Sequence, residues 1–244
     1  MADSHDPAAL YPDIATEGSL AAALQAVAVR DGLSVAFEAS ESAALQQASV
    51  ASGIPHRTVL SISAWAVERR WSIRGCESFQ GLVLVDGSTG DLVQLARAAQ
   101  AWQDGEELAD IHSVAPFVDL SGRFEVPDGD PVRLIESEWQ HLLTEADAAN
   151  WPEYRALIKA AHAEPVLRGL YPFTSHWTLR FSTSIRPHLT DVPLCLDAHR
   201  QKPYTVSTRY LGEILAAAPT AEEIVSIAIR HLSSDLGTAT SGTD

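Results

Sequence analysis

The chain has 244 residues, 46% of them hydrophobic, and a formal net charge of −15 at pH 7. This length allows one large domain or two small ones, and the composition fits a soluble globular protein. The acidic balance disfavours nucleic acid and anionic membranes as partners, and no run of about 18 apolar residues predicts a membrane span. The two cysteines, Cys76 and Cys195, are far apart in the sequence, which favours a reducing, cytoplasmic compartment over a disulfide scaffold.

The first half of the chain predicts an α+β lobe over residues 17–120, preceded by a flexible N-terminal arm over residues 1–16. Alternating apolar residues in its centre favour antiparallel strands joined by short turns. The expected elements are a helix over 17–30, strands over 33–37, 43–51, 57–65, 68–75 and 81–85, a helix ending near residue 102, and a short helix over 106–112.

The segment Asp86-Gly87-Ser88-Thr89-Gly90-Asp91 superficially resembles a phosphate loop, but it lacks the lysine of that motif. The simpler interpretation is that Ser88 or Thr89 caps the following helix, with Asp91 in its first turn.

The second half predicts a linker over residues 121–131, a second α+β lobe over 132–232 and a disordered tail over 233–244. The fold class is therefore α+β with two lobes, each a small antiparallel sheet packed against helices. The expected elements are helices over 132–146 and from Pro152, a strand over 175–183, strands over 193–197 and 204–208, and a final helix opened by the capping box of Thr220 and Glu223.

The predicted strand over residues 175–183 supplies the main site candidates. Period-two alternation places Trp177, Leu179 and Phe181 on one face and His176, Thr178, Arg180 and Ser182 on the other. On such a polar face His176 could shuttle a proton, and Arg180 could clamp a carboxylate or phosphate. The alternatives are a structural histidine that donates to a backbone carbonyl, and an arginine paired with Asp191, Asp197 or a glutamate.

Further candidates surround that strand, and each has a structural alternative. Arg155, Lys159 and His162 share one face of the helix that begins at Pro152, which is either a ligand-binding or a solvated face. Tyr171 and Trp177 suit the core or a pocket wall, and ligand stacking is the other reading. The ligand-binding candidates are Arg155, His162, Tyr171, Ser175, Trp177 and Thr178; no spacing predicts a metal site, and no fingerprint predicts a cofactor.

Charge is unevenly distributed along the chain. Residues 151–210 hold eight Lys/Arg against four Asp/Glu, so this segment carries +4 and the remainder −19. The basic segment either docks on the protein's own acidic remainder, which we favour, or attracts an anionic ligand or acidic partner.

The run YPFTSHWTLRFS, preceded by WPEYRALIKAAHAEPVLRGL, resembles the C-terminal hallmark of a bacterial family of unknown function labelled as natural-product biosynthesis proteins. The segments PTAEEIVSIAIRHL and DGSTGDLVQLARAAQAWQDGEELADIHSVAPF fit that family too, so the resemblance covers most of residues 57–232. It departs at STSIRPHLTDV, where a more aromatic, glycine-containing segment is expected. The resemblance implies a pathway context and supplies no catalytic residues.

Two functions follow as expectations. The first is a tailoring or accessory protein of secondary metabolism that binds a polar or anionic intermediate, free or carrier-bound, between the lobes near His176 and Arg180, with cofactor-free acid–base chemistry (cyclisation, elimination or hydrolysis) if it is catalytic. The second is a non-catalytic recognition module for an acidic peptide or carrier protein.

Overall fold

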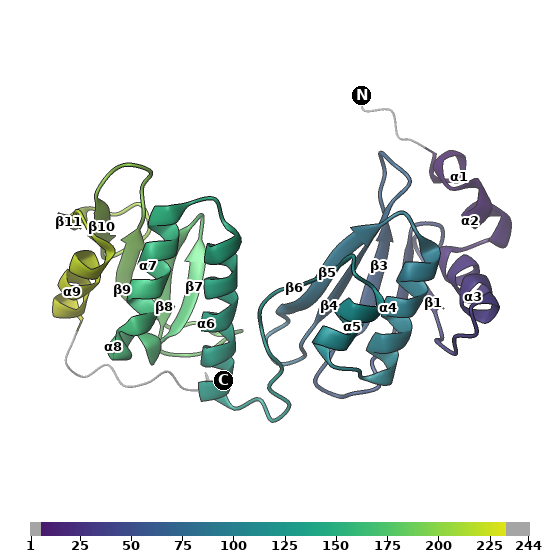
Figure 1. Cartoon of the computed structure of the whole chain (residues 1–244), viewed down its shortest axis with the longest axis horizontal. Helices are drawn as coiled ribbons and strands as arrows, with labels where there is room; N and C mark the ends of the chain where they lie inside the picture. Colours follow the sequence, from purple (N-terminus) through teal and green to yellow (C-terminus); the bar gives the residue numbers. More distant parts are fainter. Residues whose placement is uncertain (1–5, 233–244) are drawn as a thin grey trace. The chain divides into compact units, whose positions relative to one another are not determined.

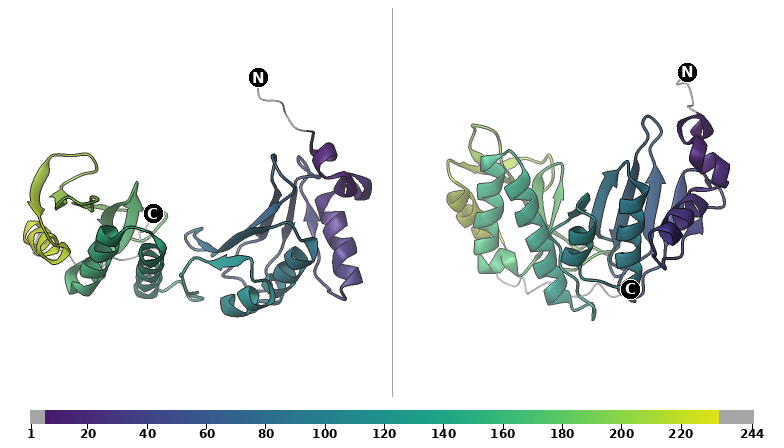
Figure 2. Two further views of the ribbon diagram at one scale, coloured as in Figure 1. Left: turned by 45° about the horizontal axis from the view of Figure 1, so that its top comes forward. Right: turned by 45° about the vertical axis from the view of Figure 1, so that its right-hand side comes forward.

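A computed structural model describes residues 6–232 of the chain. The chain divides into two compact units, Met1–Ser121 and Gly122–Asp244. Among the described residues, the first unit holds a six-stranded sheet and the second a five-stranded sheet. Both sheets are antiparallel and both carry helices (Figure 1, Figure 2). The predicted two-lobe α+β architecture is confirmed.

The first unit is an antiparallel meander whose strands are neighbours in chain order, from β1 to β6. Its helices and strands are α1 (Pro7–Leu10), α2 (Pro12–Glu17), α3 (Leu20–Arg30), β1 (Glu38–Ala39), β2 (Gln47–Val50), β3 (Leu60–Ala64), β4 (Trp71–Cys76), β5 (Val83–Thr89), α4 (Leu92–Asp104), α5 (Leu108–Val114) and β6 (Val118–Leu120).

The core of the first unit lies between one sheet face and helices α3 and α4. Alternate strand residues such as Ile62 and Ile73 are buried there, together with Trp102 of α4. A Cβ atom on Gly75 would lie 2.5 Å from the Trp102 ring, so the glycine lets the helix approach strand β4. The Trp102 indole donates to the carbonyl of Thr58 at 3.1 Å, which satisfies its buried N–H.

The expected flexible arm over residues 1–16 is wrong for its described part, which forms α1 and α2. Tyr11 and Ile14 are buried, and the Tyr11 hydroxyl donates to the carbonyl oxygens of Trp65 (2.7 Å) and Arg70 (3.0 Å). These contacts hold the segment on the sheet although its own sequence has little periodicity. Residues 1–5 and the predicted tail over 233–244 lie outside the described residues.

The strand expected over residues 33–37 is also wrong. Its backbone bonds to side chains of α4 instead of a neighbouring strand: the Ser34 N–H donates to Gln100 Oε1 at 2.7 Å and the Ala36 N–H to Gln103 Oε1 at 2.9 Å. The short edge strand β1 begins only at Glu38.

The segment Asp86–Thr89 belongs to strand β5 and not to a loop. Helix α4 therefore starts later than expected, and its N-cap is Asp91, whose carboxylate accepts from the Val93 N–H at 2.8 Å. Gly87 has φ +148° and lies against strand β6, where a Cβ atom would come within 2.3 Å of the Phe117 carbonyl oxygen. Glycine at this position thus permits β5 to extend.

The second unit has the strand order β11-β10-β9-β8-β7. Its elements are α6 (Pro131–Ala148), α7 (Pro152–Ala163), α8 (Pro165–Arg168), β7 (Tyr171–Ser175), β8 (Thr178–Ser182), β9 (Asp191–Asp197), β10 (Tyr204–Ser207), β11 (Ile214–Ala218) and α9 (Ala221–His231).

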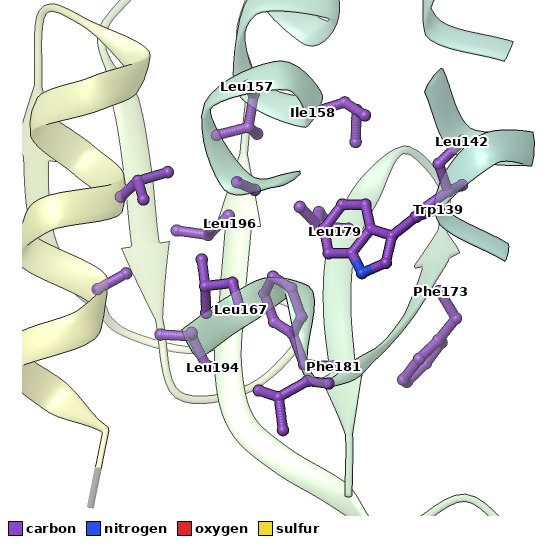
Figure 3. Close-up of a cluster of buried hydrophobic side chains, with 14 of the residues drawn as sticks. Trp139, Leu142, Leu157, Ile158, Leu167, Phe173, Leu179, Phe181, Leu194 and Leu196 are labelled. Carbon is purple, nitrogen blue, oxygen red and sulfur yellow. The ribbon is translucent and has the colours of Figure 1, made fainter. Parts of the chain in front are cut away.

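Helices α6, α7 and α9 cover one face of this sheet with the apolar stripes that their sequences predict. The α7 stripe of Tyr154, Leu157, Ile158 and Ala161 is buried as expected. Figure 3 shows Trp139 of α6 beside Leu179 and Phe181 of β8, and the Trp139 and Phe181 ring centroids are 6.3 Å apart. The predicted cap of α9 is present, since Thr220 accepts from the Glu223 N–H at 3.2 Å.

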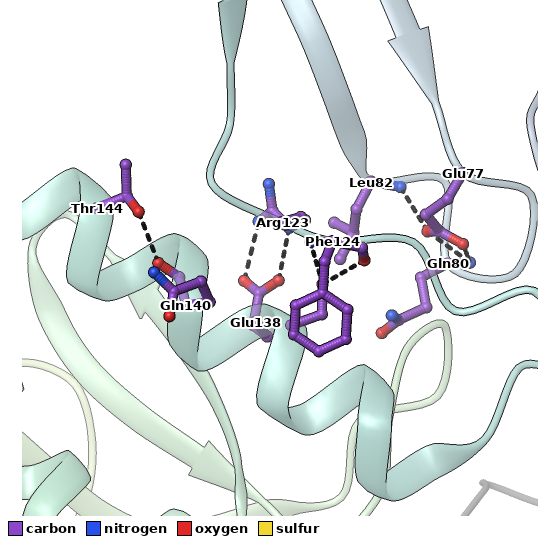
Figure 4. A network of polar contacts seen from close by, with 9 residues as sticks. Glu77, Gln80, Leu82, Arg123, Phe124, Glu138, Gln140 and Thr144 are labelled. Atoms are coloured by element: carbon purple, nitrogen blue, oxygen red, sulfur yellow. Dashed lines mark hydrogen bonds and ion pairs between the residues drawn. The ribbon is translucent and has the colours of Figure 1, made fainter. Parts of the chain in front are cut away.

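The segment expected to be a linker has no helix or strand over residues 121–130, but part of it packs on α6. Arg123 forms a two-pronged ion pair with Glu138, at 2.8 and 3.0 Å, and both side chains are less than a tenth exposed. Figure 4 shows this pair and, within the first unit, the Glu77 carboxylate that accepts from the N–H groups of Gln80 and Leu82. The composition of this segment does not predict that Arg123 holds it on α6.

Candidate functional site

The single strand expected over residues 175–183 is wrong: His176 and Trp177 form a tight turn between strands β7 and β8. Ser175 pairs with Thr178 across the hairpin, so the loop contains only these two residues. Both have positive φ, +52° for His176 and +70° for Trp177. The sequence hid the turn because its usual signal, Asn-Gly or a similar pair, is absent.

The turn positions carry a conformational cost. A two-residue hairpin with positive φ at both positions normally takes Asn or Gly, because other side chains crowd the backbone in the left-handed region. Backbone strain of this kind persists where the surrounding structure imposes it and is concentrated at functional sites. Two aromatic side chains at such a turn therefore point to a role beyond chain reversal.

Both side chains of the turn lie in aromatic surroundings. The His176 ring stacks on Tyr210, with centroids 5.6 Å apart and planes at 18°, and its Nδ1 lies 3.4 Å from Ser175 Oγ. The Trp177 ring meets Tyr154 edge-on at 5.1 Å and Trp151 at 6.0 Å. His176 is exposed and Trp177 is 45% exposed, so each ring keeps surface open to a ligand.

Cations flank these rings. The Arg200 guanidinium lies 5.2 Å over the Trp151 ring, and its loop is held by the Gln201 N–H, which donates to Glu153 Oε1 at 3.1 Å. Among residues 6–232, Arg200, Lys202 and Arg209 form no ion pair. We call His176, Trp177, Trp151, Arg200 and Tyr210 the hairpin-tip surface.

Other cations of the basic segment are paired inside the protein. Arg155 and Lys159 both reach Asp147, at 3.3 and 2.8 Å, and the hydrogen bond from Lys159 is the main cause that lowers the pKa of Asp147. Arg180 pairs with Asp191 of β9, one of the partners that its structural alternative named, and lies 4.9 Å over the Phe173 ring. The pairs of Arg155 and Lys159 with Asp147 agree with the expectation that the basic segment docks on the acidic remainder, whereas Asp191 belongs to the basic segment itself.

The remaining candidates are dispersed. His162 packs on Trp139 with centroids 5.3 Å apart, and burial, followed by the charge of Arg168, lowers its pKa. Tyr171 is fully buried and burial raises its pKa. Thr178 donates to Asp197 of β9. The structure therefore joins Ser175, His176, Trp177 and Thr178 at the turn, although the buried Thr178 side chain is bonded to Asp197. It places Arg155, His162, Tyr171 and Arg180 elsewhere in the second unit.

Cys195 and His199 are two further ionisable residues of the second unit. Burial raises the pKa of Cys195, which keeps its thiol protonated and weakly nucleophilic. His199 Nε2 lies 3.1 Å from Thr205 Oγ1. Within the described residues no three His, Cys, Asp or Glu side chains are grouped as a metal site would require.

Sequence reasoning missed Trp151, Arg200 and Tyr210 as site residues. They come from a helix start and two loops, so no periodic pattern connects them to the hairpin. All three lie in the segment 151–210 whose positive charge was noted, and that uneven distribution of charge is the one signal that points to them.

None of the described helices is both long and apolar enough to cross a membrane. No curated protein and no solved structure matches the chain. Residues 133–243 match the model of a family of unknown function, DUF6193, and this range contains every residue of the hairpin-tip surface.

Proposed function

We propose that this chain is a binding protein that recognises a flat, anionic molecule at the hairpin-tip surface. The observation that carries the proposal is the His176-Trp177 turn, in which two partly open aromatic rings occupy positions that favour Asn and Gly. The ring faces offer stacking area, and the neighbouring cations supply the attraction for negative charge.

Arg200 is the group best suited to bind the anion. Its guanidinium lies over the Trp151 ring, and among the described residues no group accepts a hydrogen bond from its N–H donors, which are the groups that bind a carboxylate or phosphate. Lys202, without an ion pair among the described residues, adds positive charge in the same loop. The remainder of the chain carries −19, so an anion is repelled from most other parts of the protein.

The pathway context comes from the resemblance to natural-product biosynthesis proteins. In this proposal the ligand is an intermediate of secondary metabolism that carries an aromatic or otherwise planar group and a negative charge. If the protein is an enzyme, we assign proton transfer to His176, whose exposed ring lies beside the Ser175 hydroxyl.

A second candidate, recognition of an acidic peptide or carrier protein, is favoured by the exposure of the surface. Trp177 is 45% exposed on a projecting turn, which suits contact with a macromolecule as well as a small ligand. Such an interaction weakens strongly with added salt, because it depends on several exposed charges.

The test is a titration of the full chain with 2-naphthoate, followed by the fluorescence anisotropy of the ligand. Arg200→Gln and Trp177→Leu should each weaken binding by about tenfold, the typical weight of a charge-assisted hydrogen bond or an aromatic stack. The matched control is Arg133→Gln, an exposed arginine of α6 whose carboxylate partner Asp128 is 3.7 Å away, and it should bind like the wild type.

Two further measurements distinguish the two candidate functions. A hexaglutamate peptide that binds at low salt while 2-naphthoate does not would favour the macromolecular partner. His176→Gln separates catalysis from binding, because an enzyme would lose turnover of a pathway intermediate and a binding protein would lose only the affinity that the ring contributes. Equal affinity of all variants for both probes would refute the proposed surface.

A further inference from the structure

The sheet of the first unit carries two rows of polar side chains on the face opposite helices α3 and α4. They alternate with the buried residues of strands β3 and β4, so every second residue points away from the core. Cross-strand pairing aligns Gln47, Ser63, Ser72 and Ser88 in one row and Ser49, Ser61, Arg74, Asp86 and Asp119 in the other.

Arg74 lies in the middle of the second row. Its cross-strand neighbours are Ser61 on one side and Asp86 on the other, yet among the described residues its guanidinium forms no ion pair or hydrogen bond. Two other arginines near this sheet are engaged, since Arg69 pairs with Asp13 at 2.7 Å and Arg70 with Glu68 at 2.9 Å. Arg74 is thus a cation of this sheet that is available to a ligand.

The parts of both polar rows that lie on strands β3 to β6 line a groove with a cavity volume of about 520 Å³. Four serines of three adjacent strands contribute hydroxyl groups to it, and Trp65 also lines it. The Arg70 guanidinium lies 5.5 Å over the Trp65 ring, which is 37% exposed. The serines in the lining are Ser61, Ser63, Ser72 and Ser88.

The charges in the groove select one ligand class. Asp86 and Asp119 are cross-strand partners, and neither carboxylate has a hydrogen bond or ion pair among the described residues. A purely anionic ligand would meet Arg74 but be repelled by both carboxylates, and a purely cationic ligand would be repelled by Arg74. A neutral polyol would leave all three charges uncompensated. A ligand that carries both a positive and a negative group can pair with all three charged side chains at once.

We propose that this groove binds a small zwitterion of the amino acid or short-peptide class. The ligand carboxylate lies against the Arg74 guanidinium, the ligand ammonium lies between Asp86 and Asp119, and the serine hydroxyls bond its remaining polar atoms. The Trp65 ring packs on its side chain. This site lies wholly in the first unit and does not depend on the function proposed for the hairpin-tip surface.

The experiment uses the full chain and free L-lysine as probe, followed by amide shifts in ¹H–¹⁵N NMR spectra. L-Lysine should give saturable shifts in strands β3, β4 and β5. Cadaverine, which keeps the amines and lacks the carboxylate, and succinate, which keeps carboxylates and lacks the amine, should bind at least about tenfold more weakly.

Arg74→Gln should weaken L-lysine binding by about tenfold. The matched control is Arg30→Gln, an exposed arginine at the end of helix α3 in the same unit, which should leave the affinity unchanged. Both side chains are exposed, and an unchanged amide spectrum outside the groove confirms that each variant is folded. Equal affinity of the two variants for L-lysine, equal binding of cadaverine, or no saturable shift would overturn the proposal.

Discussion

Replacing His176 with Asn tests whether the hairpin turn is kept for binding at the expense of stability. Asn is the residue that tolerates the left-handed region best after Gly, and it is common in two-residue hairpin turns. If His176 were needed for folding, its replacement would destabilise the second unit. If the ring is kept for ligand contact, the same replacement should relieve strain.

The structure sets the expected magnitude. At φ +52° His176 occupies the left-handed region, where a residue other than Gly or Asn pays about 1–2 kcal/mol, and Asn recovers about half of that. The lost stack on Tyr210 is exposed, so its contribution lies near the low end of the range for aromatic pairs, about 0.5 kcal/mol. The free energy of unfolding should therefore stay the same or rise by about 0.5 kcal/mol.

The assay is urea unfolding of the full chain, with the transition of the second unit followed by near-UV circular dichroism. Tyr210→Leu is the control, because it removes the same stack without relieving the turn and should lower the free energy of unfolding by about 0.5 kcal/mol. His176→Asn should also weaken 2-naphthoate binding. A loss of stability above about 1 kcal/mol in His176→Asn would refute the reasoning, since the histidine would then be a structural residue.

Three further predictions concern the second unit. Glu138→Gln should lower the free energy of unfolding by about 3 kcal/mol in urea because it removes the carboxylate charge from a buried, two-pronged ion pair with Arg123, whereas Asp128→Asn at an exposed pair should cost less than about 1 kcal/mol. Cys195 should react with iodoacetamide far more slowly in folded protein than in urea; equal rates would contradict its burial and raised pKa. The pKa of His162 is lower in the folded chain than in the unfolded chain, so below about pH 6.5 the unfolded chain binds more protons at this residue. The stability that the neutral ring contributes is therefore complete above that pH. It is lost as the pH falls through the pKa of the folded state. His162→Gln should flatten this part of the stability–pH curve, and an unchanged curve would contradict it.

Periodic and capping signals predicted the fold well where local chemistry and tertiary packing agree. The buried stripe of α7 and the Thr220 cap of α9 are as the sequence indicates. The errors fall where long-range contacts decide. Tyr11 holds the N-terminal segment on the sheet although the sequence of that segment has little periodicity. Gln100 and Gln103 accept hydrogen bonds from the extended segment over residues 33–37, which the sequence suggested would pair with a strand.

The candidate site was only partly predictable. Ser175, His176 and Trp177 were singled out from an alternation that continues through the turn by chance, because the two turn residues interrupt neither the polar nor the apolar pattern. Arg200 and Tyr210 join them through loops whose positions depend on tertiary packing. The groove around Arg74 was missed because its serines are unremarkable in sequence and become a site only through strand register.

The most direct test of the binding surface is the response of individual tryptophan indole N–H signals to 2-naphthoate. The account predicts that the Trp177 and Trp151 signals shift together along one saturation curve, and that Arg200→Gln abolishes the shift. A shift of Trp65 in the first unit with Trp177 unmoved, or shifts that never saturate, would contradict it.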